Sequence, residues 1–251
     1  MSILESELIK YRRTLMQKLT VIAPLFFVLQ ASLQKFFMPA GYFRPWQLIT
    51  SLVFNWWPVI FLPLGVALSA VLADSQERKA GGYRGLRSRN IPPAYIWASK
   101  AAAMAIYSFT AAAVLLVSTA LAGLITAKGG VPWGRIISAC LVLWVASLPL
   151  IPIQLCAAAW KGMFSSMAVG FTGMMSGVFA AQKSYWFVNP WSWGTRMMCP
   201  VIGVHPNGTL LTKSSPLWDP SVLPIGLALS LAAFIVITAV TALWFSGKEV
   251  K

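Results

Sequence analysis

Side chains that could carry out catalysis are scarce in this chain. A single histidine, His205, and three isolated cysteines, Cys140, Cys156 and Cys199, accompany only six acidic residues. A nucleophile needs a base beside it, and a metal needs a cluster of ligands. No paired spacing of these residues supplies either, so we interpret the cysteines as small buried hydrophobic residues. A membrane enzyme with a serine-based or backbone-based site is kept as an alternative.

The polar segment 74–100 could do a different kind of chemistry, which is charge-assisted binding. Its sequence, DSQERKAGGYRGLRSRNIPPAYIWASK, contains six Lys or Arg residues and separates two strongly apolar runs. Charges and a few apolar anchors are the usual means by which a partner protein fixes its register on a surface. We predict that another protein grips the chain here; the alternative is a solvated basic loop that only sets the topology.

Membrane-spanning helices must hold this segment. With 58% hydrophobic and 10% charged residues, the chain has too little polar surface for a soluble globule. Six apolar runs reach the roughly 20 residues that a helical span needs, and they lack the alternation of barrel strands. We therefore predict an all-α polytopic membrane protein with one transmembrane domain over residues 1–251. The predicted spans are 19–37, 49–73, 101–127, 136–159, 163–182 and 222–246.

The distribution of positive charge predicts the orientation of these spans. With the N-terminus inside, 13 of the 20 Lys and Arg residues fall on the inner side and seven on the outer side. This excess predicts that both termini and the segment 74–100 are cytoplasmic. The net charge of +14 is then explained by topology and by attraction to anionic membrane lipid, not by nucleic acid.

The first residues, 1–17, are predicted to form an amphipathic helix on the inner membrane surface. Ser2 followed by Glu5 is the pattern of a capping box. Apolar residues share one helical face and charged residues occupy the others, as an interfacial helix requires. A solvated tail is the alternative. The apolar face would contain Ile3, Leu4, Leu8, Tyr11 and Leu15.

Two spans contain prolines that should disturb their helices. Pro58 and Pro63 interrupt the second span, and Pro149 and Pro152 interrupt the fourth, because proline removes a backbone donor. Broken membrane helices can line a substrate path, although prolines also serve packing. The candidate path residues in the second span are Asn55, Trp56, Trp57 and Pro58.

Charged groups are absent from the predicted spans apart from Lys35, at the outer end of the first one. Proton-coupled carriers and many ion channels need ionisable groups inside the membrane, so both classes are disfavoured. The energy for any transport must then come from a partner.

The segment 183–220 is predicted to be an extracellular loop rich in tryptophan. Trp186, Trp191 and Trp193 either form an aromatic belt at the lipid headgroups or touch an amphipathic substrate. Small residues four apart in the fifth span allow close helix approach, either in a dimer or within one bundle. These rows are Gly162, Ser166 and Gly170, and then Gly173, Gly177 and Ala181.

Four stretches carry a resemblance to a known family. They are ESELIKYRRTLMQKLTVIAPLFFVLQA, LADSQERKAGGYRGLRSRNIPPAYIWASK, IPIQLCAAAWKGMFSSMAVGFTG and WFVNPWSW. In pattern and order, the chain resembles the permease subunits of lantibiotic-immunity ABC transporters, the MutE/EpiE family of type 2 ABC exporters. It departs from that family over residues 86–92, where the family usually has Leu-x-Ser-Leu-Pro.

The resemblance implies a partner for the segment 74–100. In such exporters a short cytoplasmic helix between spans two and three docks on a separate ATPase, and this chain has no phosphate-binding loop of its own. The implied partners are an ABC ATPase dimer that binds ATP and Mg²⁺, a second permease subunit, membrane lipid and a peptide substrate. Cofactors are not expected in this chain. The implied coupling residues are Glu77, Arg78, Tyr83, Leu86, Arg87 and Arg89.

The resemblance further implies that this permease expels a membrane-active peptide, a lantibiotic, from a bacterial cytoplasmic membrane. Two alternatives are kept. The first is export of another hydrophobic drug, lipid or natural product. The second is a membrane anchor or sensor partner that transports nothing.

Overall fold

The described part of the chain is built from helices. The computed structural model describes residues 2–34, 37, 46–79 and 91–247, and these form no named strand. The α-helices are α1 Ile3–Tyr11, α2 Leu15–Gln34, α3 Gln47–Trp56, α4 Leu62–Lys79, α6 Pro93–Thr126, α7 Trp133–Ser147, α8 Leu150–Lys161, α9 Met163–Ala180, α10 Pro190–Ile202 and α11 Val222–Gly247. A π-helix, η2 Trp57–Phe61, joins α3 to α4, and two 3₁₀ turns, η3 Trp186–Val188 and η4 Pro216–Trp218, flank α10.

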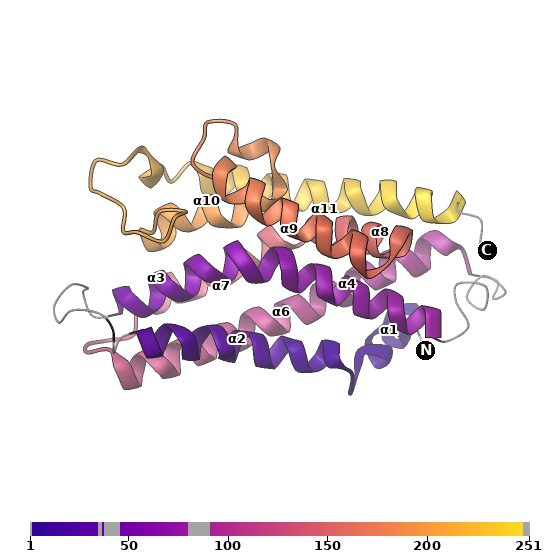
Figure 1. Ribbon diagram of the computed structural model, residues 1–251, viewed down its shortest axis with the longest axis horizontal. Helices are drawn as coiled ribbons and strands as arrows, with labels where there is room; N and C mark the ends of the chain where they lie inside the picture. Colours follow the sequence, from indigo (N-terminus) through magenta and orange to yellow (C-terminus); the bar gives the residue numbers. More distant parts are fainter. Residues whose placement is uncertain (1, 35–36, 38–45, 80–90, 248–251) are drawn as a thin grey trace.

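Six stretches are long and apolar enough to cross a membrane, which confirms the predicted all-α polytopic fold. They are α2, the α3–η2–α4 helix, α6, the α7–α8 pair, α9 and α11. Figure 1 shows these helices side by side along the long axis of the molecule. Helix α1, the last turns of α4 and α11 and the first turn of α6 all lie at one end, which we name the α1 end. The opposite end, where α10 lies, is the α10 end.

The second span is irregular at Pro58, although it was expected to be kinked or partly unwound and is neither broken nor unwound there. Between α3 and α4 the helix widens into the π-turn Trp57–Phe61, with Pro58 near its start. A π-turn accommodates the missing proline donor while the helix continues, so the span is locally widened instead of unwound. The rings of Trp57 and Phe61 stack across this turn, with centroids 3.9 Å apart. The fourth span is divided, because α7 ends at Ser147 and α8 starts after Pro149.

Small residues of α9 pack within the bundle. The Ser166 hydroxyl donates to the Ala67 carbonyl of α4 over 3.1 Å. A Cβ on Gly170 would meet the Pro63 carbonyl oxygen of α4 at 3.0 Å. On the second row, Gly173 and Gly177 both lie directly under Trp191 of α10. Of the two readings of these rows, packing within one bundle therefore accounts for the described contacts.

The segment 183–220 differs from the predicted loop. It contains the 13-residue helix α10, of which Ser192 to Cys199 are buried. Trp186 and Trp193 are buried as well, and the Trp193 indole donates to the Phe187 carbonyl over 3.1 Å. The Asn189 side chain caps α10 by accepting a hydrogen bond from the Trp191 amide, and the helix begins at the next residue, Pro190. Trp186, Trp193 and the middle of α10 therefore belong to the core at the α10 end, whereas Tyr185, Phe187 and Trp218 remain exposed.

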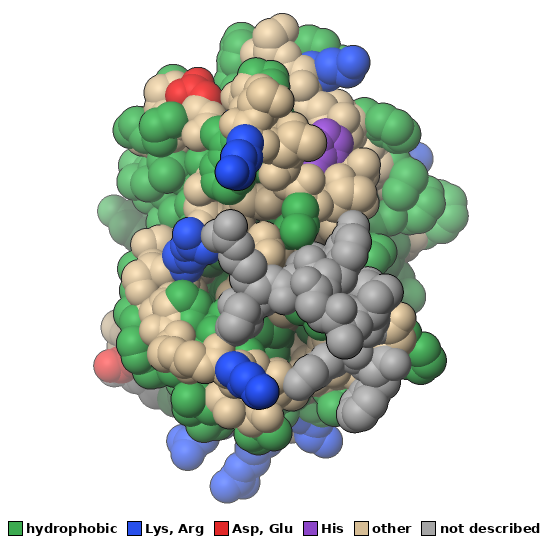
Figure 2. Space-filling view, turned by 90° about the vertical axis from the view of Figure 1, so that its left-hand side faces the viewer, with side chains coloured by type: hydrophobic (Ala, Val, Ile, Leu, Met, Phe, Trp, Pro, Cys, Tyr) green, Lys and Arg blue, Asp and Glu red, His purple; other side chains and the backbone are tan. Residues whose placement is uncertain are grey.

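The surface of the α10 end carries scattered positive charge. Figure 2 looks onto this end and shows Lys and Arg side chains separated by hydrophobic and neutral polar groups. The exposed cations at this end include Lys128, Lys183 and Lys213 in loops and Arg135 in the first turn of α7. The α1 end differs in that, beside exposed cations such as Arg12 and Lys161, it holds the buried charges of Glu7, Glu77 and Lys100.

The contact between Gly173 and Trp191 gives a stability prediction. In Gly173→Ala the new Cβ would lie 2.3 Å from the indole atoms of Trp191, so α9 and α10 must separate. We expect a loss of about 1–3 kcal/mol, as for other overpacked cores. Thr172→Ala, at an exposed neighbouring position, is the matched control. Thermal unfolding in detergent measures both, and equal melting temperatures would show that the helices are not in this contact.

Candidate functional site

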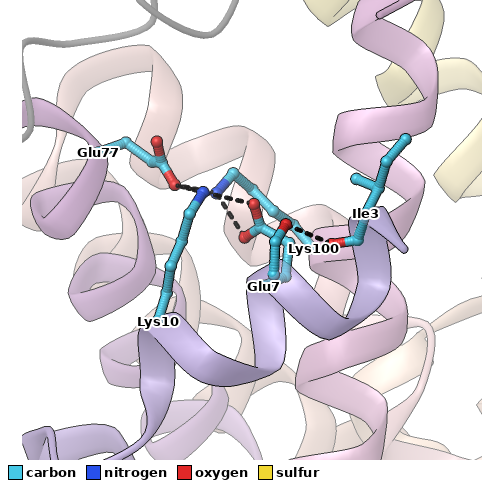
Figure 3. A network of polar contacts seen from close by, with 6 residues as sticks. Ile3, Glu7, Lys10, Glu77 and Lys100 are labelled. Carbon is cyan, nitrogen blue, oxygen red and sulfur yellow. Dashed lines mark hydrogen bonds and ion pairs between the residues drawn. The ribbon is translucent and has the colours of Figure 1, made fainter. Parts of the chain in front are cut away.

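Four charged side chains from three helices meet at the α1 end (Figure 3). Lys100 of α6 donates to Glu7 of α1 over 2.8 Å and to Glu77 of α4 over 2.5 Å. Lys10 of α1 donates to the same two carboxylates, over 2.6 Å to Glu7 and 2.7 Å to Glu77. We call Glu7, Lys10, Glu77 and Lys100 the ion-pair junction. It joins the helices on both sides of residues 80–90 to the N-terminal helix.

The ion-pair junction is almost entirely removed from solvent. Glu7 and Lys100 are each 1% exposed and Glu77 is 3% exposed, whereas Lys10 keeps a partly exposed side chain. Two acids and two bases make the cluster neutral overall. Buried charges are tolerated when they are paired and hydrogen-bonded, but removing one partner leaves another charge uncompensated.

The sequence of α1 explains why it presents these groups to the bundle. Ser2 and Glu5 form a reciprocal capping box, which confirms that prediction and starts the helix at Ile3. Glu7 and Tyr11 are four residues apart, so they share the face that packs on the bundle. The Tyr11 ring meets the Tyr107 ring of α6 edge-on at 5.7 Å. The helix ends at Tyr11, and Arg13 has a left-handed φ of 63° before α2 begins at Leu15.

This orientation differs from the predicted amphipathic helix over residues 1–17. Leu4 and Leu8 pack against the core as expected of the apolar face, but the acidic Glu7 is also buried. Ile9, in contrast, is exposed. Ion pairs with Glu77 and Lys100 hold this face of α1 against the bundle. The periodicity of apolar residues alone cannot reveal such an attachment.

The ionisable groups of α1 respond to this environment. Burial acts against the charge of Lys10, but hydrogen bonds and attraction from Glu7 and Glu77 outweigh it and raise its pKa above 10.5. Burial, followed by the negative charges of Glu7 and Glu77, raises the pKa of Tyr11 well above 10.0. Both groups therefore keep their protons in the folded protein at neutral pH.

A second ion pair, within α4, holds an arginine that contacts α8 at the same end. Arg78 donates from Nε to Asp74 over 2.6 Å, and its Nη2 lies 3.4 Å from the Ala158 carbonyl oxygen of α8. Asp74 is buried, whereas the Arg78 side chain is 52% exposed. The last turns of α4 are thus attached both to α1 and α6 and to α8.

The matched family decides what kind of protein carries this junction. Residues 3–177, more than half of the chain, match the family described as ABC-2 family transporter protein. The chain belongs to this family. No curated protein and no solved structure matches the chain. The matched residues contain the entire ion-pair junction and the helices that build it.

Membership defines the chain as the membrane component of an ABC transporter, which works with an ABC ATPase. In this ABC-2 permease the residues predicted to meet the ATPase fall into two groups. Tyr83, Leu86, Arg87 and Arg89 lie outside the described residues. Glu77 and Arg78 are described, and they differ sharply.

The structure corrects the expected role of Glu77. Its carboxylate is buried and engaged by Lys10 and Lys100, so it does not offer a charge to a partner. The reason is the length of α4, which continues past the predicted end of span two at residue 73 as far as Lys79. Arg78, with half of its side chain exposed, keeps a surface from which it can act.

The same extension corrects the expectation that Lys35 is the one charged residue of the spans. Lys35 lies outside the described residues. Asp74 and Glu77 lie in the last turns of the second span, and Lys100 lies in α6, which begins at Pro93 instead of residue 101. Proline is favoured at the first turn of a helix, so the Pro92–Pro93 pair explains the earlier start.

The predicted substrate-path residues of this permease are largely packed. Asn55, Trp57 and Pro58 are buried, and Trp56 is half-buried. A Cβ on Gly194 of α10 would contact Pro58 at 3.3 Å, so the second span and α10 are in close contact. Trp186 and Trp193 are buried, and Trp191 is half-buried against α9. The two predicted groups therefore meet, but as packed core.

Sequence reasoning missed Glu7, Lys10 and Lys100 as members of one site. The available signals were an acid and a base three residues apart on the N-terminal helix, an acid at the end of span two and a lysine near the start of span three. Among the described residues, no three His, Cys, Asp or Glu side chains gather as a metal site would need.

Removal of the central lysine tests the ion-pair junction. Lys100→Met leaves Glu7 and Glu77 buried with Lys10 alone, and we expect a loss of about 3 kcal/mol. Adding Glu7→Gln should recover part of it, because one unpaired charge is then gone. Lys183→Met, at an exposed position, is the control. If Lys100→Met melts at the control temperature in detergent, the junction does not stabilise the fold.

Alkaline pH should weaken the attachment of α1. A folded pKa above the unfolded value stabilises the protein fully below the unfolded pKa, and this stabilisation is lost as pH rises through the folded pKa. For Lys10 and Tyr11 we expect the melting temperature to fall above about pH 10. The double variant Lys10→Gln and Tyr11→Phe should lose less stability between about pH 9 and 12 than the parent. An identical pH profile would assign the loss to other groups.

Proposed function

We propose that this ABC-2 permease exports a membrane-active antimicrobial peptide, a lantibiotic, by coupling its spans to a partner ATPase dimer. The ATPase binds ATP and Mg²⁺, and residues 74–100 form the docking element. A second permease subunit, similar or identical, completes the transporter. The segment 74–100 and both termini are cytoplasmic in this proposal, and the membrane is the bacterial cytoplasmic membrane.

The observation that carries the proposal is the ion-pair junction. Glu77 lies just before residues 80–92 and Lys100 just after them, and both bind the same α1 side chains. A force applied between these flanks therefore moves α1, α4 and α6 together. Such a connected end is what a docking element needs if nucleotide-driven closure is to reach the spans.

The charge distribution supports contact with a separate protein at this end. Arg78, Lys79 and the adjoining Arg84, Arg87 and Arg89 make the segment strongly basic. Glu77 is occupied by Lys10 and Lys100, so it does not neutralise that surface, whereas Asp74 offsets the charge of Arg78 alone. We assign Leu86 and Tyr83 as apolar anchors and the arginines as register-setting contacts.

The proposed peptide substrate rests on the resemblance to lantibiotic-immunity permeases and on the apolar character of the spans. A membrane-active peptide would enter from lipid and be held by apolar and aromatic contacts. The alternatives are another hydrophobic drug, lipid or natural product, and a non-transporting anchor or sensor partner.

ATP hydrolysis by the reconstituted transporter tests the proposal. The permease is co-purified with the ATPase encoded beside it, and hydrolysis is measured with and without a lantibiotic. We expect the peptide to stimulate hydrolysis in the parent. The double variant Leu86→Asp and Arg87→Glu should reduce the rate to the unstimulated level or abolish co-purification. The first change replaces the apolar anchor with an acid, and the second reverses the charge of a register-setting arginine.

The matched control is Lys128→Glu combined with Val131→Asp, in the loop between α6 and α7 at the α10 end, which should retain stimulation. Stimulation by other hydrophobic compounds but not by lantibiotics would replace the proposed substrate. An ATPase that binds but whose hydrolysis no compound changes would favour the anchor or sensor alternative.

A further inference from the structure

Helices α8, α9 and α11 enclose an apolar groove of about 380 Å³. Trp160 of α8 and Trp244 of α11 lie at the ends of their helices nearest the α1 end (Figure 1). Val169 of α9 and Ile237 of α11 line its walls. The groove therefore runs along the bundle and opens where the spans approach the membrane surface.

The surroundings of the groove face hydrocarbon. On α11, Val240 and Leu243 are 59% and 72% exposed, and Trp160 is 61% exposed. Large apolar side chains at such exposure within membrane spans contact lipid. An alkyl chain matches both the shape and the chemistry of this groove, since it has no hydrogen bonds to lose on entry.

The mouth of the groove is positively charged. Lys161 directly follows Trp160, and its ammonium lies 4.5 Å from the centre of that ring. Lys161 is exposed, and within the described ranges no carboxylate pairs with it. Arg78 is held beside the same turn of α8 by its contact with the Ala158 carbonyl oxygen. A tryptophan and a lysine without a carboxylate partner among the described residues, at the end of a span, suit the phosphate level of a bilayer.

Ser165 adds a polar group inside the groove. It is 8% exposed and lines the groove. It also lies in the first turn of α9, an 18-residue helix whose N-terminal end favours negative charge. The hydroxyl can donate to an ester or phosphate oxygen of a molecule seated there.

We propose that this groove binds one anionic phospholipid, with an acyl chain between α8, α9 and α11 and its phosphate at Lys161. The net positive charge at the mouth favours an anionic headgroup over a zwitterionic one. Retention of such a lipid would stabilise the packing of three spans at the end where the ion-pair junction lies. This proposal concerns a resident lipid and does not depend on what the permease exports.

Lipid binding by the purified full-length chain tests the site. Native mass spectrometry counts the bound lipid in mixed micelles that contain phosphatidylglycerol or phosphatidylcholine. We expect the parent to prefer phosphatidylglycerol. Lys161→Gln should reduce its binding about fivefold, the effect of one lysine at an anionic surface. Val169→Phe should displace either lipid by filling the groove.

Two controls carry the same chemical changes elsewhere. Lys128→Gln removes an exposed lysine at the α10 end, and Val236→Phe enlarges an exposed residue of α11 outside the groove. Both should bind lipid as the parent does. The proposal is overturned if Lys161→Gln and Lys128→Gln lose equal amounts, or if Val169→Phe and Val236→Phe do. It is also overturned if Val169→Phe converts a dimer to a monomer without changing bound lipid, since protein would then cover the groove.

Discussion

A buried ammonium group requires carboxylates, and Lys100 finds them on two different helices. Glu7 comes from the N-terminal helix and Glu77 from the last turns of the second span. Because neither acid can leave without stranding a charge in a region of low polarity, α1, α4 and α6 are held in one arrangement. Lys10 completes the neutral cluster and ties the two acids a second time. The docking element proposed for the ATPase begins and ends on this fixed base.

The two ends of the bundle are held together by different physical means. At the α1 end, ion pairs and a tyrosine pair join helices that are far apart in sequence. At the α10 end, large aromatic side chains lie on glycine, as Trp191 does on Gly173 and Gly177. Trp46 packs on Gly123 of α6 in the same way. The stability of the aromatic contacts is sensitive to changes of a few tenths of an ångström in the distance between helices. The stability of the ion-pair junction depends instead on each charge keeping its oppositely charged partners.

The sequence was sufficient for the features that depend on local order. Apolar runs of sufficient length predicted six spans, prolines predicted the disturbed second and fourth spans, and Ser2 with Glu5 predicted the capping box. The sequence was insufficient where burial depends on distant partners. Lys100 and Glu7 are 93 residues apart, and Lys10 and Glu77 are 67 apart, so no local pattern pairs them. Helix α10 was missed for a related reason, since its sequence contains Pro190, Gly194 and Pro200 and the helix is stabilised by contacts with α7, α9 and α11.

The position of the π-turn constrains how the proposed coupling could reach the far end of the permease. From Leu62 to Glu77, helix α4 is a continuous rod of roughly 23 Å, at 1.5 Å per residue. A displacement at the ion-pair junction is therefore delivered along the rod to Trp57–Phe61, where the regular hydrogen-bond pattern changes. Pro58 of that turn lies against Gly194 of α10, close to buried Trp193. Coupling through span two must then either rearrange the contact between Pro58 and Gly194 or move α10 together with the span. Motion at the α1 end can therefore open the α10 end only if the π-turn transmits that motion.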